Sequence, residues 1–277
     1  MKIVRTILEF NNARNSLSDS IGFVPTMGAL HDGHLSLIKE SKNNCNYTVV
    51  SIFVNPNQFG PDEDFDNYPR TLESDIQKLE TLNIDILFLP ESNELYPPNH
   101  KDSKFQSNLF NILEGTTRPL FFKGVCKVVA RLFDIVKPTD AFFGEKDFQQ
   151  FRIISDMATA LKYNINIIPC KTIRESNGLA MSSRNEYLTN NQRDRAGIIF
   201  TTLQSGIELI NSGQNNKSTI YNKLTNMILS EPIIKIDYLK IVDYNSLKEF
   251  NDIIDKKFVI CIAVYIDNTR LIDNLYQ

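Results

Sequence analysis

The stretch that decides the fold is Ile21-Gly22-Phe23-Val24-Pro25-Thr26-Met27-Gly28-Ala29-Leu30-His31-Asp32-Gly33-His34. The apolar run 21–25 predicts a buried strand, and a helical pattern begins near Leu35. In the turn between them, Gly28 and Gly33 permit close approach to the backbone. The N-terminus of the following helix offers unpaired N–H groups and a positive dipole end, which together favour a phosphate.

Further apolar runs continue this rhythm along the chain, with helical patterns between them. They cover residues 48–54, 84–89, 140–143 and 164–169. The alternation indicates a parallel α/β sheet. In Val49-Val50-Ser51-Ile52-Phe53-Val54 nearly every position is apolar, which predicts strands covered on both faces. We therefore expect a Rossmann-like doubly wound sheet, with ligands bound beyond the carboxyl ends of its strands.

The pattern changes after about residue 172. A polar loop, two helical patterns and two β-rich stretches follow, at 174–178, 190–211, 217–229, 233–243 and 257–266. This order predicts a smaller α+β domain. We expect a nucleotide- and substrate-binding domain at 1–172 and a C-terminal lid domain at 173–277, with 173–189 as hinge and lid segment.

Composition narrows the class of protein. The 277 residues are 42% hydrophobic and carry a net charge of −3, with a pI near 5.7, so no basic surface for a nucleic acid is expected. Neither a signal peptide nor an apolar stretch of 18 residues is present, which predicts a cytoplasmic protein without a membrane partner. Four scattered cysteines, expected to be reduced, are Cys45, Cys126, Cys170 and Cys261.

His31 and His34 are the strongest candidates for chemistry. Paired imidazoles beside a helix N-terminus can donate hydrogen bonds to the charge that develops on a leaving pyrophosphate. The alternatives are two surface histidines or half of a zinc site, but neither His100 nor the cysteines supply a further ligand at a recognisable spacing. The motif His31-Asp32-Gly33-His34 resembles the signature of the nucleotidyltransferase superfamily, which includes adenylyltransferases and class I aminoacyl-tRNA synthetases.

A second anion-binding motif is Met181-Ser182-Ser183-Arg184. Two hydroxyls and a guanidinium in succession can clamp a phosphate, although a serine that caps a helix explains Ser182 or Ser183 as well. A third motif, Phe143-Gly144-Glu145-Lys146-Asp147-Phe148-Gln149-Gln150, again joins a strand to a helix. Lys146 can contact phosphate and Asp147 can accept from ribose hydroxyls, with helix capping as the alternative for Asp147.

Uncharged amides follow the second strand. Asn55 and Gln58 can bind the hydroxyl and carboxylate groups of a small acid, and Gln150 lies one turn beyond Lys146. Turn formation at Asn55-Pro56 explains part of the same pattern.

In this order and spacing, the four motifs resemble the pantothenate synthetase family over almost the whole chain. Supporting stretches are Gly124-Val125, Ile173-Arg174-Glu175 and Arg270-Leu271-Ile272-Asp273-Asn274. The resemblance implies condensation of (R)-pantoate with β-alanine, with ATP as substrate and Mg²⁺ as cofactor, through a pantoyl-adenylate. It also implies a homodimer that binds only small molecules.

The resemblance assigns roles residue by residue. His34 is the proton donor and acts with His31, Lys146 and Arg184. ATP is assigned to Met27, Gly28, Ala29, Leu30, His31, Asp32, Gly33, His34, Gly144, Glu145, Lys146, Asp147, Ile173, Met181, Ser182, Ser183 and Arg184. Pantoate is assigned to Gln58, Gln150 and Asn55, and β-alanine to Gln58. For magnesium, of the two acidic residues Glu73 and Asp75, we choose Asp75.

The chain departs from the family at two places. Relatives usually have Arg-Pro-Gly-His-Phe where this chain has Arg118-Pro119-Leu120-Phe121-Phe122, and a serine or threonine where it has Lys127. An apolar group therefore replaces a polar one near the expected pantoate pocket.

Two other functions compete with this one. An adenylyltransferase that makes a dinucleotide would need cations for a phosphorylated substrate, whereas Gln58 and Gln150 favour an acid with neutral hydroxyls. A regulator that binds nucleotide without turnover would not need every phosphate-facing residue type. An aminoacyl-tRNA synthetase is excluded by size and by the lack of a basic face.

Overall fold

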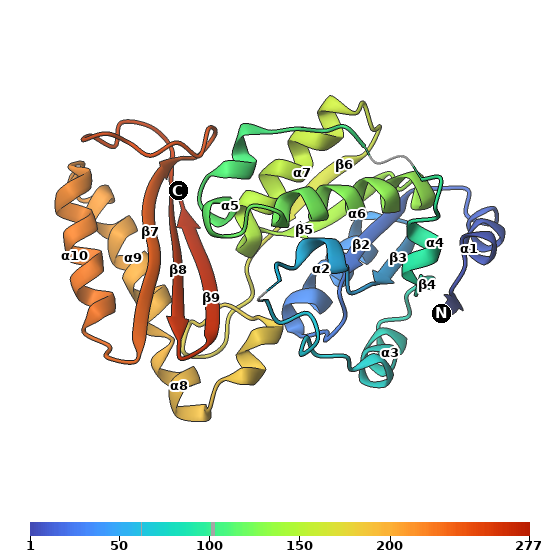
Figure 1. Ribbon diagram of the computed structural model, residues 1–277, viewed down its shortest axis with the longest axis horizontal. Coiled ribbons are helices and arrows are strands. Elements are labelled where there is room, and N and C mark those ends of the chain that lie inside the picture. Colours follow the sequence, from blue (N-terminus) through green and yellow to red (C-terminus); the bar gives the residue numbers. More distant parts are fainter. Residues whose placement is uncertain (62, 101–102) are drawn as a thin grey trace. The chain divides into compact units, whose positions relative to one another are not determined.

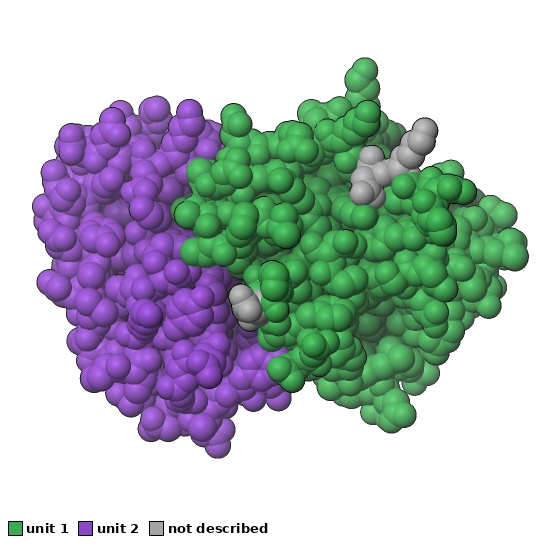
Figure 2. All heavy atoms as spheres, viewed as in Figure 1, with its two compact units in different colours: residues 1–171 green, residues 172–277 purple. Residues whose placement is uncertain are grey.

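The computed structural model describes residues 1–61, 63–100 and 103–277. The chain divides into two compact units, Met1–Lys171 and Thr172–Gln277 (Figure 2). Within the described ranges, no helix is both long enough and apolar enough to cross a membrane.

The first unit is built on a six-stranded parallel sheet (Figure 1). Its strands in chain order are β1 (Lys2–Val4), β2 (Ile21–Thr26), β3 (Tyr47–Ile52), β4 (Ile86–Phe88), β5 (Asp140–Gly144) and β6 (Asn166–Cys170). The spatial order is β1-β4-β3-β2-β5-β6. Every strand expected from the apolar runs is present. The edge strand β1 was not predicted, because three residues are too few for a recognisable period.

Helices cover both faces of this sheet. They are α1 (Ile7–Arg14), α2 (Asp32–Asn44), α3 (Leu72–Thr81), α6 (Phe121–Val136) and α7 (Phe148–Ala160), with the short α4 (Ser92–Leu95) and α5 (Glu114–Thr117). Successive strand residues enter opposite cores: Phe23 packs in the core that contains α1, α6 and α7 residues, and Val24 in the core that contains α2 and α3 residues. This alternation confirms the doubly wound α/β class.

The direction of winding reverses at β2. From β2 the chain runs outward through β3 to β4, whereas β5 and β6 lie on the other side of β2. In open α/β sheets, ligands bind at such a switch point, beyond the carboxyl ends of the strands. The turns after β2 and after β5 are therefore the positions where a site is expected.

The second unit is α+β, as expected. Its antiparallel strands are β7 (Ile234–Asp243), β8 (Phe258–Ile266) and β9 (Thr269–Tyr276), in the order β7-β8-β9. Helices α9 (Ile198–Asn211) and α10 (Lys217–Leu229) share one apolar core with β8. The helical pattern expected over 190–211 is divided, because a separate helix α8 (Asn190–Arg195) ends before Gly197. A Cβ at Gly197 would lie 2.5 Å from the carbonyl oxygen of Asn177.

Candidate active site

The turn after β2 has an unusual backbone. Gly28 has φ of +83° and Ala29 has φ of +50°, both in the left-handed region. The hydroxyl of Thr26 donates to the Ser51 carbonyl at 2.8 Å and accepts from the Gly28 N–H at 3.2 Å, which ties the start of the turn to β3. These two bonds fix the start of the turn relative to β3.

Helix α2 begins at Asp32, three residues earlier than the sequence pattern suggested. The reason is a cap made by the two histidines. Nδ1 of His31, the N-cap residue, accepts from the Gly33 N–H at 3.1 Å, and Nδ1 of His34 accepts from the His31 N–H at 3.4 Å. The ring centroids lie 4.1 Å apart. Both histidines thus belong to the N-terminus of the helix, where an anion is favoured.

Both imidazoles are neutral at physiological pH. Burial, and after it the charge of the nearby Lys146 ammonium, lower the pKa of His31 to about 4. Burial, then the charges of His31, Lys146 and Lys78, hold the pKa of His34 well below its ordinary value. Since each Nδ1 accepts a backbone N–H, the hydrogen-bond network assigns the single ring proton to Nε2. Each ring therefore presents one Nε2–H donor.

This protonation state has a measurable pH dependence. Between the ordinary histidine value of 6.5 and the folded value of about 4 for His31, the unfolded chain binds more protons than the folded one. The contribution of the neutral His31 ring to the folding stability is therefore complete above pH 6.5, the pKa in the unfolded chain. It is lost as the pH falls toward about 4, the pKa in the folded chain. We expect ¹⁵N-histidine NMR of a His100→Gln variant to show both remaining rings neutral from pH 8 down to about 6. A ring that titrates at its ordinary value would contradict the burial argument.

The turn after β5 places Lys146 near the two histidines. Lys146 lies in the 3₁₀ helix η3 (Glu145–Asp147), which separates β5 from α7, and its charge acts on both imidazoles. Its Nζ lies 3.6 Å from Oδ1 of Asp147. Asp147 is the N-cap residue of helix α7, all of whose residues are described, but its side chain makes no capping hydrogen bond. The alternative that Asp147 serves to cap this helix therefore receives no support. The two turns at the switch point thus meet.

Of the two amide residues Asn55 and Gln58, Asn55 forms its hydrogen bonds with other groups of the protein. It is fully buried, and its Nδ2 donates to Gln58 Oε1 and to the Gly124 carbonyl, both at 3.1 Å. Its Oδ1 accepts from Asn57 and from the Tyr96 hydroxyl. This geometry favours a supporting role for Asn55 over the substrate contact predicted for it. Asn55 holds Oε1 of the buried Gln58, whose Nε2 donates to Sδ of Met27 at 2.9 Å.

The two neighbouring glutamines of α7 have different environments. Gln149 is buried and holds the preceding loop, since it accepts from the Glu114 N–H and donates to the carbonyls of Leu109 and Ile112. Gln150 is half-buried on the first turn of the helix.

The departures from the family pattern have local partners. The Arg118 guanidinium forms an ion pair with Glu63 at 2.5 Å and lies 3.7 Å over the Phe121 ring. Leu120 is 57% exposed, while the Lys127 ammonium lies 4.6 Å over the Tyr96 ring. A cation stacked on an aromatic ring thus occurs at both departures.

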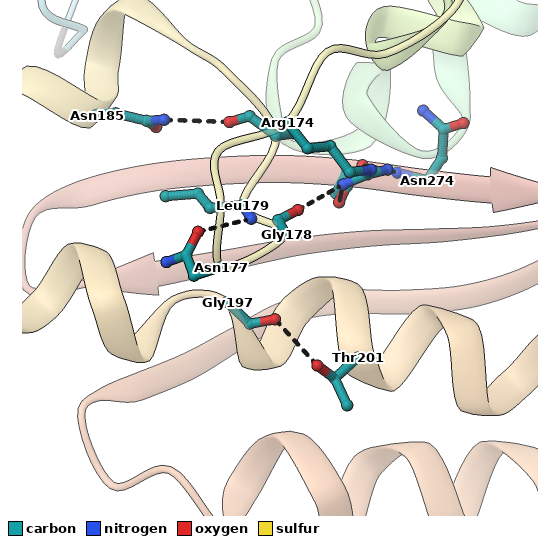
Figure 3. A network of polar contacts seen from close by, with 10 residues as sticks. Arg174, Asn177, Gly178, Leu179, Asn185, Gly197, Thr201 and Asn274 are labelled. Atoms are coloured by element: carbon teal, nitrogen blue, oxygen red, sulfur yellow. Dashed lines mark hydrogen bonds and ion pairs between the residues drawn. The ribbon is translucent and has the colours of Figure 1, made fainter.

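The residues on either side of the Met181–Arg184 motif form hydrogen bonds within the second unit, and Figure 3 shows those of Arg174, Gly178 and Asn185. Ser182 caps the 3₁₀ helix η4 (Ser183–Tyr187) by accepting from the Arg184 N–H, so the capping alternative is realised at this residue. Upstream, Arg174 donates to both oxygens of Asp273 on β9, at 2.5 and 3.0 Å, and to the Gly178 carbonyl. These bonds tie the start of the 174–185 segment to β9 of the same unit.

Asp75 lies beside the turn after β2, residues 28–31, which we call the histidine turn. Its side chain is buried, since the residue is 1% exposed. Its oxygens accept from the N–H groups of Ala29 and Leu30 and from the Thr71 hydroxyl. The described part of the chain contains no group of three His, Cys, Asp or Glu residues that could hold a metal ion. These residues do not fit a protein-built magnesium site, and the contacts of Asp75 favour a role in shaping the turn.

The sequence analysis missed Lys78, whose Nζ donates to the Leu30 carbonyl at 2.5 Å. The available signal was its position three residues after Asp75 on one helix face.

The fold and the site define a Rossmann-like nucleotide-binding enzyme, with a histidine turn and a lysine at the switch point of its sheet. A model of the pantoate-β-alanine ligase family matches residues 2–276, and the chain belongs to this family. The resemblance seen in the sequence is thereby confirmed. The chain is a ligase, which decides against a regulator without turnover.

Individual relatives are similar to this chain over nearly its full length. The pantothenate synthetase of Fervidobacterium nodosum is 47% identical and that of Thermosipho africanus 44%, with 99% of each chain covered. The crystal structure of the Thermus thermophilus pantothenate synthetase has a TM-score of 0.93 at 37% identity, with 99% of both chains covered. The Francisella tularensis pantoate-β-alanine ligase, crystallised with β-γ ATP and β-alanine, has a TM-score of 0.81 at 38% identity, with 100% and 97% covered.

Proposed function

We propose that this ligase condenses (R)-pantoate with β-alanine in an ATP-dependent reaction that gives pantothenate, AMP and pyrophosphate through a pantoyl-adenylate. The observation that carries the proposal is the pair of neutral imidazoles at the N-terminus of α2, with Nε2–H donors and the charge of Lys146 beside them. The F. tularensis relative, whose crystals contained β-γ ATP and β-alanine, supports the choice of substrates.

In the first step, a carboxylate oxygen of pantoate attacks the α-phosphorus of ATP. The bond from this phosphorus to the bridging oxygen breaks, and its electron pair leaves with pyrophosphate. Negative charge gathers on the leaving group, where His31, His34 and Lys146 act as preorganised donors. Because the rings are neutral, His34 serves as a hydrogen-bond donor through Nε2–H and transfers no proton at this step.

In the second step, the amine of β-alanine attacks the carbonyl carbon of the adenylate. The bond from this carbon to the phosphate oxygen breaks, AMP leaves with the electron pair, and the amine proton passes to solvent. No covalent bond to the protein is required, since both nucleophiles are substrate groups. For the acid, the Nε2 amide of Gln58, which donates to Met27 Sδ, is the donor on this side of the sheet, and Gln150 contributes from α7.

The remaining assignments stay predictions from the family resemblance. They are the contributions of Ile173 and of Met181 to Arg184 to ATP binding, the ribose contact of Asp147, the functional roles of the two domains, and the homodimer. Magnesium usually binds through substrate phosphates and water, with few protein ligands. No step proposed here passes through the metal.

The decisive experiment tests whether adenylation of pantoate precedes the attack by β-alanine. With ATP, magnesium and pantoate but no β-alanine, we expect the enzyme to exchange labelled pyrophosphate into ATP while free AMP stays near background. Adding β-alanine should then release AMP and pantothenate together. A requirement for β-alanine in the exchange reaction, or the appearance of ADP, would replace the adenylate by another intermediate.

A further inference from the structure

Two side chains of opposite charge on helix α3 form hydrogen bonds with the backbone of the turn at residues 28–31. Asp75 and Lys78 are three residues apart and therefore share one face of the helix. Oδ2 of Asp75 accepts from the Ala29 N–H at 2.9 Å and Oδ1 accepts from the Leu30 N–H at 2.8 Å. Lys78 donates to the carbonyl of the same Leu30 at 2.5 Å. Both backbone groups of Leu30 are thus held from α3.

The turn needs such support because its backbone is strained. A left-handed backbone conformation is unfavourable for a non-glycine residue such as Ala29, because its Cβ approaches the following carbonyl oxygen. Leu30 is 2% exposed, so its N–H would lose a hydrogen bond with water and find none in the helix. Successive N–H groups in this conformation form a concavity that binds anions. In this protein the Asp75 carboxylate fills that concavity.

The position of His31 depends on the same contacts. His31 directly follows Leu30, and its own N–H donates to Nδ1 of His34. If Leu30 shifts, this bond shifts too, and with it the direction of both Nε2–H donors. Charged or titratable groups that act on the rings are Asp32, Lys78, Lys146, Asp147 and, for His34, His31.

We propose that Asp75 and Lys78 are positioning residues that hold the 28–31 turn, so that both histidines keep their Nδ1 atoms on the backbone and their Nε2–H donors toward the phosphates. This inference rests on the proposed function for its catalytic consequence. The ring geometry that it describes exists without substrate and can be measured separately.

Asp75→Asn tests the proposal, because an amide has one acceptor oxygen where the carboxylate has two. We expect the turnover of pyrophosphate exchange to fall about 10- to 100-fold while the KM for pantoate changes little. In ¹⁵N-histidine NMR without ligand, the His31 and His34 signals should lose their fixed Nε2–H tautomer. The matched control is Asp85→Asn, because Asp85 accepts from the Thr48 N–H at 2.7 Å in the same unit and away from the turn. It should leave turnover and both histidine signals unchanged.

Lys78→Met tests the second contact and decides the matter if Asp75→Asn fails to fold. Its control is Lys42→Met, because Lys42 donates to the Asn83 carbonyl at 2.8 Å on the surface. We expect Lys78→Met, and not the control, to perturb the histidine signals and to slow exchange about tenfold.

The outcomes separate the two hypotheses. If the wild-type enzyme showed no pantoate-dependent exchange while the histidine signals still responded to Asp75 and Lys78, the proposed function would fail and the positioning role would stand. Normal turnover and unchanged signals in both variants would overturn the positioning role. Recovery of Asp75→Asn at high magnesium would also overturn it, in favour of a metal ligand.

Discussion

His34→Ala is expected to lower pantoate-dependent pyrophosphate exchange by at least about a hundredfold. Loss of one oriented donor to a charged transition state typically costs about 2.7–4 kcal/mol. Nε2–H of His34 is such a donor, because Nδ1 is engaged with the His31 N–H and the ring is neutral. ATP binding should weaken less than turnover, since the other phosphate-facing groups remain. Exchange kinetics with varied ATP measure both effects.

His31→Ala is the informative comparison for this variant. His31 is the N-cap of α2, so its loss should slow exchange and also destabilise the fold by about 0.5–2 kcal/mol. His34→Ala keeps the cap bond between His31 and Gly33 and loses the bond from the His31 N–H, so it should destabilise the fold less than His31→Ala does. Wild-type turnover in a folded His34→Ala protein would remove His34 from the mechanism.

Arg174→Met is expected to cost the second unit about 3–5 kcal/mol of unfolding free energy, because it leaves the buried Asp273 carboxylate without the opposite charge of Arg174. Asp273 is 4% exposed, and Arg174 holds it by two bonds while lying 3.9 Å over the Phe200 ring. The same change frees the Gly178 carbonyl and loosens the segment before Met181 (Figure 3). Adenylation should therefore slow as well. Denaturant unfolding followed by circular dichroism measures the stability.

The control is Lys240→Met, which breaks an exposed ion pair with Glu249 and should cost no more than about 1 kcal/mol. The double variant Arg174→Met/Asp273→Leu should recover much of the loss, since a buried pair can often be replaced by apolar groups. A single-variant cost as small as that of Lys240→Met would show that the Arg174–Asp273 pair does not hold this segment.

Several features of this protein followed from the sequence because they are local. Runs such as 48–54 are apolar at nearly every position, and this pattern indicates a doubly covered strand whatever its neighbours are. The His31–His34 motif was found in the same way, since the turn that carries it joins a strand directly to a helix. The first residue of α2 was misjudged because histidine seldom serves as an N-cap, and only the bond to Gly33 reveals it.

Other features were decided only by the tertiary structure, because they depend on groups far apart in the chain. The low pKa of the rings comes from burial and from charges that include Lys146, more than 100 residues away from His34 in the sequence. Asp75 meets Ala29 across 46 positions, and Arg174 meets Asp273 across 99. Spacing within a motif carries no information on such pairs. Desolvation and long-range hydrogen bonding, which exist only in the folded chain, therefore determine what these side chains do.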